Sequence, residues 1–111
     1  MKEIKAFIRP NKIKEVISSL RREGHCCLTV FEGEGTGDYT DPEKEWPSLK
    51  LPFLHSKIFK LEVVCEDSKV EAICDIIRQN GKTGKSGDGL IYVSDVQDTF
   101  KIRDTKDDNV K

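Results

Sequence analysis

One short loop, residues 82–89, collects the groups that could bind a phosphate. Its glycines leave the backbone free to approach a ligand closely, and consecutive N–H groups in such a loop can cradle an anion. Hydroxyl and ammonium groups add further donors, so the full set is Gly84, Gly87, Gly89, Thr83, Ser86, Lys82 and Lys85. The loop is therefore predicted to bind a phosphate, and the alternative is a plain glycine-rich turn between a helix and a strand.

Two common phosphate motifs do not match this loop. Gly84-Lys85-Ser86 copies the end of a Walker A sequence, but Gln79 stands where the first glycine should be. The expected element order, helix then loop then strand, is also the reverse of a P-loop. The glycine spacing G-x-x-G-x-G is likewise the reverse of the dinucleotide fingerprint.

The cations after residue 100, the cysteines and the histidines give weaker indications of a binding or catalytic site. Alternation after residue 100 places Lys101 and Arg103 on one side, where they could grip phosphates or form a solvated edge. The four cysteines, Cys26, Cys27, Cys65 and Cys74, contain no C-x-x-C pair and are predicted to be buried and reduced, as in a cytoplasmic protein. His25 and His55 stand alone, with no nucleophile–base pair, which argues against an enzyme. Adjacent Cys26 and Cys27 would point to opposite faces of a strand, which argues against a shared metal site.

Hydrophobic periodicity predicts the elements that position these groups. Alternating residues predict strands at 2–9, 25–32, 57–65 and 90–94. An apolar stripe predicts a helix from Pro10 to Gly24, and a second helix follows a Ser68–Glu71 capping box and ends at Gly81. Residues 33–55 show neither period and are predicted to form a long functional loop.

The two halves of the chain repeat. A shift of 57 residues places the apolar and glycine positions of the first helix on those of the second, for example Ile13 on Val70 and Gly24 on Gly81. Two strand-helix-strand units give a βαββαβ chain, an α+β fold of the ferredoxin-like type with both helices on one face of an antiparallel sheet. Subunit association is the expected cover for the other face.

Composition limits the partners. At 111 residues, with a formal net charge of −1 and 35% charged residues, the chain is predicted to be one domain without the basic field that drives nucleic-acid binding. No apolar run reaches the length of a membrane span, and the first residues lack the apolar core of a signal peptide. A cytoplasmic protein with no membrane insertion is expected.

Over nearly its whole length the sequence resembles the PII signal-transduction proteins, and residues 83–93 are similar to the B-loop signature of that family. The resemblance implies one PII-like domain, residues 1–111, with a T-loop at about 33–56, a B-loop at 82–89 and a C-terminal segment at 95–111. It implies a homotrimer that binds ATP, ADP or AMP between subunits, with magnesium left open. The T-loop would regulate a transporter or enzyme.

The resemblance also implies a nucleotide site. Thr29, Glu62 and Val64 would contact the adenine end. Ribose and phosphates would meet the glycine-rich segments, which are Gly35, Gly37, Thr83, Gly84, Gly87, Asp88 and Gly89. Lys101 and Arg103 would reach the phosphates from a neighbouring subunit.

Four positions depart from the family pattern. Leu90 replaces a phosphate-binding lysine and Lys101 an arginine, which predicts a bias toward ADP or AMP over ATP. Tyr39 and Ile58 replace the glutamine and lysine of the family's 2-oxoglutarate site. The rival hypothesis is a small enzyme on the same fold that hydrolyses a nucleotide or an acyl phosphate.

Overall fold

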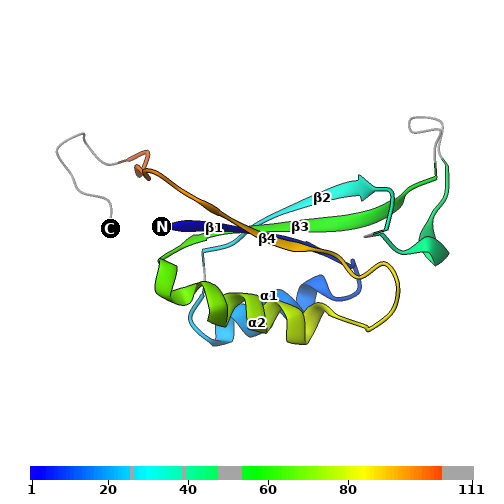
Figure 1. The fold of residues 1–111 in the computed structure, drawn as a ribbon, viewed down its shortest axis with the longest axis horizontal. Coiled ribbons are helices and arrows are strands. Elements are labelled where there is room, and N and C mark those ends of the chain that lie inside the picture. The colour runs from blue at the N-terminus through cyan, green and yellow to red at the C-terminus, as the bar shows by residue number, and fades with distance from the viewer. Residues whose placement is uncertain (26, 39, 48–53, 104–111) are drawn as a thin grey trace.

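Two strand-helix-strand units follow each other in the computed structural model, which describes residues 1–25, 27–38, 40–47 and 54–103 (Figure 1). The elements are β1 (Lys2–Ile8), α1 (Ile13–Arg22), β2 (Thr29–Gly35), β3 (Ser56–Cys65), α2 (Val70–Gly81) and β4 (Ile91–Asp95). The predicted order of strands and helices is confirmed.

The four strands form one antiparallel sheet in the order β2-β3-β1-β4. In the register, Ile4 on the central strand β1 lies between Val63 of β3 and Val93 of β4. The two central strands, β1 and β3, therefore come from different halves of the repeat, as in the ferredoxin-like plan. The predicted α+β fold is confirmed.

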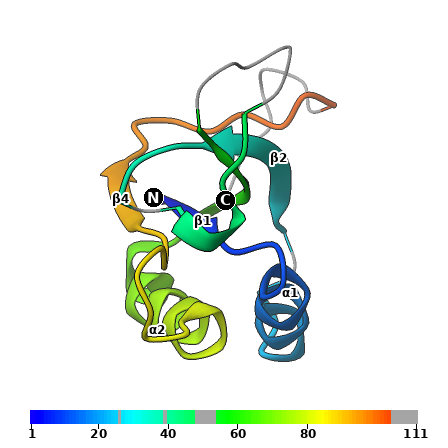
Figure 2. The ribbon, with the colours of Figure 1, turned by 90° about the vertical axis from the view of Figure 1, so that its right-hand side faces the viewer.

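Both helices pack side by side on the same face of the sheet (Figure 2). The core between them consists of the alternating residues of β1 and β3 and the apolar stripes of the helices, and its fully buried members are Ile4, Ala6, Val16, Leu20, Leu61 and Ile73. Periods of two and of 3.6 residues thus identified the inward-facing positions correctly.

Among the described residues, no helix covers the opposite face of the sheet (Figure 2). Large side chains there remain partly exposed, among them Phe31 at 49% and Tyr92 at 43%. They make cross-strand contacts, because the ring centroids of Phe7 and Tyr92 lie 6.1 Å apart and the Lys60 ammonium lies 4.9 Å from the centroid of Phe31. This face therefore carries both apolar and charged side chains.

Two predicted boundaries were wrong. The first helix begins at Ile13, because the chain first makes a turn in which the Lys12 N–H donates to the Arg9 carbonyl at 3.0 Å. The second strand begins at Thr29, because His25 still serves the helix end and donates its N–H to the Leu20 carbonyl at 2.9 Å. Gly24 makes that ending possible with a φ of 88°.

The Ser68–Glu71 capping box was also wrong. A 3₁₀ turn over Asp67–Lys69 precedes α2, and no side chain caps the helix. The Lys69 N–H closes the turn by donating to the Glu66 carbonyl at 3.0 Å. Helical turns therefore begin two residues before Ser68, the predicted cap.

The cysteines differ in burial. Cys65 is buried as predicted, and burial raises the pKa of its thiol and of the half-buried Cys74 thiol. Cys27 is exposed, contrary to prediction, because it lies before β2 starts, and Cys26 lies outside the described residues. Within the described ranges, no cluster of three His, Cys, Asp or Glu side chains is placed to hold a metal ion. No helix in those ranges is long and apolar enough to span a bilayer.

Candidate functional site

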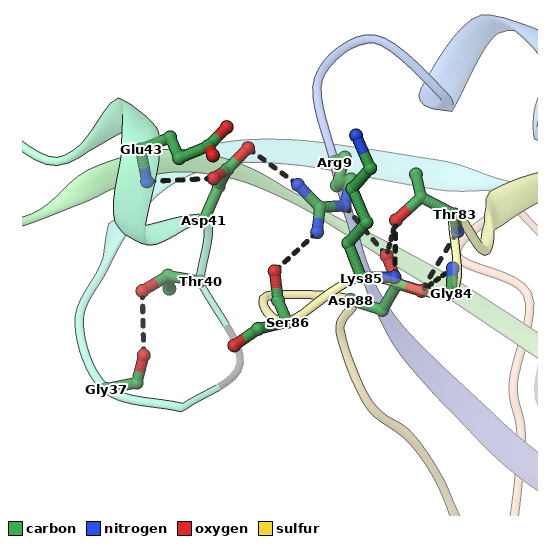
Figure 3. Close-up of polar contacts among 10 residues, drawn as sticks. All are labelled: Arg9, Gly37, Thr40, Asp41, Glu43, Thr83, Gly84, Lys85, Ser86 and Asp88. Carbon is green, nitrogen blue, oxygen red and sulfur yellow. Dashed lines mark hydrogen bonds and ion pairs between the residues drawn. The ribbon is translucent and has the colours of Figure 1, made fainter.

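The B-loop is closed by one of its own side chains. The Oδ2 atom of Asp88 accepts hydrogen bonds from the N–H groups of Thr83 and Gly84, both at 2.9 Å (Figure 3). The Oδ1 atom accepts from the Thr83 hydroxyl at 2.7 Å. These donors, which the sequence offered to a ligand phosphate, are therefore used inside the loop.

Two exposed residues of the loop have a backbone N–H with no acceptor among the described residues. In the part of the chain that the structure describes, the N–H groups of Ser86 and Gly89 donate to no protein acceptor, and both residues are exposed. Lys82 and Lys85 are exposed beside them. Cavities of about 360 Å³ and 520 Å³ border the loop, and the first is lined by Gly89 and Lys82, the second by Ser86 and Lys85.

Gly89 fixes the loop to the sheet. A Cβ atom added there would lie 1.7 Å from the Phe7 carbonyl oxygen, so only glycine lets the backbone pass this close to β1. The next residue continues the junction, because the Phe7 N–H donates to the Leu90 carbonyl at 2.9 Å. The end of the B-loop is therefore positioned by β1 before β4 begins.

Arg9 lies at the centre of the site and was not predicted as a site residue. It is 8% exposed and extends from the end of β1 toward two loops (Figure 3). Its Nε donates to Asp88 Oδ1 at 2.8 Å, its Nη2 to the Ser86 carbonyl at 2.8 Å and its Nη1 to Asp41 Oδ2 at 2.6 Å. The planar guanidinium thus joins the B-loop and the T-loop.

The T-loop packs directly on the B-loop at Gly87. A Cβ atom there would lie 2.7 Å from both the Thr40 carbonyl oxygen and the Asp41 Cα, and the φ of Gly87 is 99°. Asp41 then begins the 3₁₀ turn Pro42–Lys44, since its Oδ1 accepts from the Glu43 N–H at 3.0 Å. One carboxylate therefore both caps the turn and holds Arg9.

The T-loop contains more structure than the sequence indicated. Besides the 3₁₀ turn, Trp46 and His55 form a β-bridge through hydrogen bonds of 2.8 and 3.2 Å. His55 is 2% exposed and its Nε2 lies 3.2 Å from Glu34 Oε1, so β2 and β3 are tied together where the loop leaves the sheet. Ile58 is buried nearby, whereas Tyr39 lies outside the described residues.

The residues expected at the adenine end lie on the uncovered face of the sheet. Thr29 of β2 is directly opposite Glu62 of β3, and Val64 follows two residues later on the same face. Glu62 is half-buried, with Oε2 3.0 Å from the Lys60 ammonium. Gly35 and Gly37 lie at the start of the T-loop, where the Thr40 hydroxyl donates to the Gly37 carbonyl at 3.0 Å.

Lys101 and Arg103 are not brought to the B-loop within one chain. Both are exposed in the segment after β4, which lies toward the opposite end of the sheet from the B-loop (Figure 1). The two groups of the predicted phosphate site are therefore at opposite ends of one subunit.

Asp88 gives the site a pH dependence. Burial by itself would raise the pKa of its carboxyl, but hydrogen bonds from Arg9, Thr83 and Gly84 outweigh burial and hold this pKa well below the ordinary value of 3.8. Because the pKa is lowered on folding, the ionised carboxylate contributes stability that is fully present above about pH 5 and is lost as the pH falls below the ordinary value.

We expect Asp88→Asn to lower the free energy of unfolding by about 2 kcal/mol near pH 7, since charge-assisted hydrogen bonds to Arg9 and the loop are weakened. The difference from the wild type should shrink as the pH falls from 4 to 2. Urea unfolding across this range measures it. A difference that stays constant down to pH 2 would show that Asp88 is not held ionised in this way.

Comparison with known proteins places this site in a family. The family model described as "Nitrogen regulatory protein P-II" matches residues 1–106. Proteins of that name from Porphyra purpurea and Azospirillum brasilense are each 36% identical over 103 residues, which cover 93% of this chain and 92% of each relative. The protein of that name from Rhizobium meliloti (strain 1021) is 35% identical over the same share of both chains. The chain therefore belongs to the nitrogen regulatory protein P-II family.

Proposed function

We propose that this protein is a signalling regulator that binds an adenine nucleotide at the B-loop and controls a transporter or enzyme through the T-loop. The observation that carries the proposal is the B-loop itself, because Asp88 and Arg9 hold its backbone while the N–H groups of the exposed residues Ser86 and Gly89 donate to no acceptor among the described residues. A preorganised loop with unused N–H donors and flanking lysines suits a phosphate chain.

A trimer would complete the phosphate site. Lys101 and Arg103 lie at the other end of the subunit, so a neighbouring copy must supply them if they are to reach the phosphates. The uncovered sheet face supports such an assembly, because Phe31, Val64 and Tyr92 are 41–49% exposed on it. Thr29, Glu62 and Val64 share this face and would meet the adenine end beside the subunit boundary.

The T-loop supplies the output. Its neck is fixed by the Trp46–His55 bridge, and Trp46 and Leu54 are 46% and 60% exposed next to it. Exposed apolar side chains on a fixed neck suit contact with another protein.

Calorimetric titration with ATP, ADP and AMP, with and without magnesium, tests the proposal, and light scattering on the same sample measures the oligomeric state. We expect a trimer that binds adenine nucleotides at up to three sites. A monomer, or no heat with any of the three nucleotides at millimolar concentration, would contradict it. Steady-state phosphate release separates binding from the rival hydrolytic function.

Leu90 provides a prediction about nucleotide preference. Its side chain is 39% exposed at the end of the B-loop, and its backbone carbonyl holds Phe7, so Leu90→Lys adds a charge without disturbing that contact. We expect the variant to bind ATP about tenfold more tightly, because an ammonium near the terminal phosphate gains about 1.4 kcal/mol after solvation. AMP affinity should change little. Equal effects on ATP and AMP in calorimetry would place the terminal phosphate elsewhere.

A further inference from the structure

We infer that the Arg9–Asp41 ion pair is a clasp that holds residues 40–47 of the T-loop onto the B-loop, so that the order of one loop depends on the other. The inference deepens the proposed function, since it names the contact through which a ligand at the B-loop would act. It rests on the proposed function only for the identity of that ligand. The clasp itself is present in the protein alone (Figure 3).

Arg9 is well placed to couple the loops because its side chain is held from three directions. The Arg9 side chain is 9% exposed, and its guanidinium donates one N–H to each of Asp41, Asp88 and the Ser86 carbonyl. Breaking one of these contacts would leave a buried charge without its partner, which is costly. If the B-loop moves at Asp88 or Ser86, the Arg9 side chain must therefore move with it. Asp41 then either follows Arg9 or loses its partner.

Asp41 transmits that position to the T-loop. Its Oδ2 binds Arg9 while its Oδ1 caps the Glu43 N–H, and the Lys44 N–H donates to its carbonyl at 3.1 Å. The turn that starts the T-loop is therefore built on the residue that Arg9 holds. Backbone contact at Gly87 presses the same segment against the B-loop.

The coupling has a defined sign. A nucleotide that binds more tightly to the B-loop shape in which Asp88 and the Ser86 carbonyl hold Arg9 stabilises the docked form of residues 40–47. A ligand shifts such an equilibrium only by its differential affinity for the two forms, and the effect is reciprocal. In the wild type, nucleotide should therefore raise the docking equilibrium of residues 40–47 by some factor. Loss of the clasp should weaken nucleotide binding by that same factor.

Hydrogen exchange tests the clasp directly. The readout is the exchange of the Glu43, Lys44 and Trp46 amides, each of which donates a hydrogen bond in the docked segment. Asp41→Asn keeps an oxygen for the Glu43 cap and removes the charge that faces Arg9. Without nucleotide, we expect this variant to exchange at the three amides at least fivefold faster than the wild type, while Thr83 and Gly84 change less than twofold. Glu43→Gln, on an exposed neighbour, is the matched control and should behave as wild type.

Two glycines provide an independent pair of variants. Gly84 and Gly87 both have positive φ, 83° and 99°, so alanine strains the backbone equally at each. Only at Gly87 would the new Cβ meet the T-loop, since nothing lies within 4 Å of the corresponding position at Gly84. Gly87→Ala should therefore speed exchange at the three T-loop amides, and Gly84→Ala should not.

The outcomes separate the clasp from the proposed function. If Asp41→Asn exchanges like the wild type and Gly87→Ala like Gly84→Ala, the clasp is wrong whatever the protein binds. If the variants differ as expected but ADP neither binds nor changes exchange, the clasp stands and the proposed ligand is wrong. If ADP protects the three amides equally in the wild type and in Asp41→Asn, Arg9–Asp41 is a static contact and the coupling is refuted.

Discussion

Gly89→Ala should destabilise the protein by about 3 kcal/mol or more and dislodge the B-loop from the sheet. The added methyl would lie 1.7 Å from the Phe7 carbonyl oxygen and 2.6 Å from its carbon, both backbone atoms that cannot rotate away. Relief requires the chain to move off β1, which breaks the Phe7–Leu90 hydrogen bond at the start of the β1–β4 pairing. Overpacking against backbone is among the most costly single changes.

Urea unfolding of Gly89→Ala and of Gly33→Ala measures this effect against a matched glycine. Gly33 lies in β2 with nothing within 4 Å of the position of an added Cβ, so its replacement should change stability by less than about 1 kcal/mol. Equal stability of the two variants would show that β1 does not hold the B-loop at Gly89.

Arg9→Met should lower the free energy of unfolding by about 2–4 kcal/mol, because it leaves two carboxylates facing a buried gap. Asp41 and Asp88 are only 23% and 26% exposed, and each relies on Arg9 as a cationic partner. Removing one member of a buried ion pair leaves an uncompensated charge, which is where most of the cost arises. Methionine fills much of the volume, so packing contributes less.

The control for Arg9→Met is Lys12→Met, three residues along the chain. Lys12 makes an ion pair with Glu15 at 3.8 Å on the helix surface, a contact of at most about 0.5 kcal/mol. Adding Asp41→Asn to Arg9→Met should restore part of the lost stability, because one unpaired charge disappears. If Arg9→Met is as stable as Lys12→Met, Arg9 is not the organising residue of this site.

Local patterns were sufficient to predict the fold. Alternation at Ile4, Ala6 and Ile8 and the stripes through Val16 and Ile73 identified the buried faces, since side-chain direction follows from the period of each element. The repeat of the two halves then fixed the topology. Boundaries failed where backbone hydrogen bonds, such as that from His25 to Leu20, extended a turn beyond its pattern.

The candidate site was predicted only in its location. Glycine spacing identified the B-loop, but the partners of Arg9 lie 32 and 77 to 79 residues away in sequence, and no periodicity connects positions that far apart. Alternation placed Arg9 on the face of Lys5 and Phe7, opposite the buried Ile4, Ala6 and Ile8, so the strand pattern gave no sign that its side chain is buried. The direction of the Asp88 side chain, into its own loop, also depends on this arginine.

The nucleotide contacts assigned to residues from the family pattern remain predictions. Thr29 and Glu62 are adjacent across β2 and β3, as a shared adenine pocket requires. Lys101 and Arg103 reach the B-loop only if a second copy brings them. A single chain therefore contains each half of the proposed site and cannot by itself join them.

Amide exchange of the B-loop with and without saturating ADP tests the nucleotide site most directly. We predict that ADP slows exchange at the exposed residues Ser86 and Gly89, whose N–H groups donate to no acceptor among the described residues, and changes Thr83 and Gly84 little, because Asp88 already binds those N–H groups. Exchange at Ser86 and Gly89 that is unaltered by ADP, or protection confined to Thr83 and Gly84, would contradict a phosphate site built on this loop.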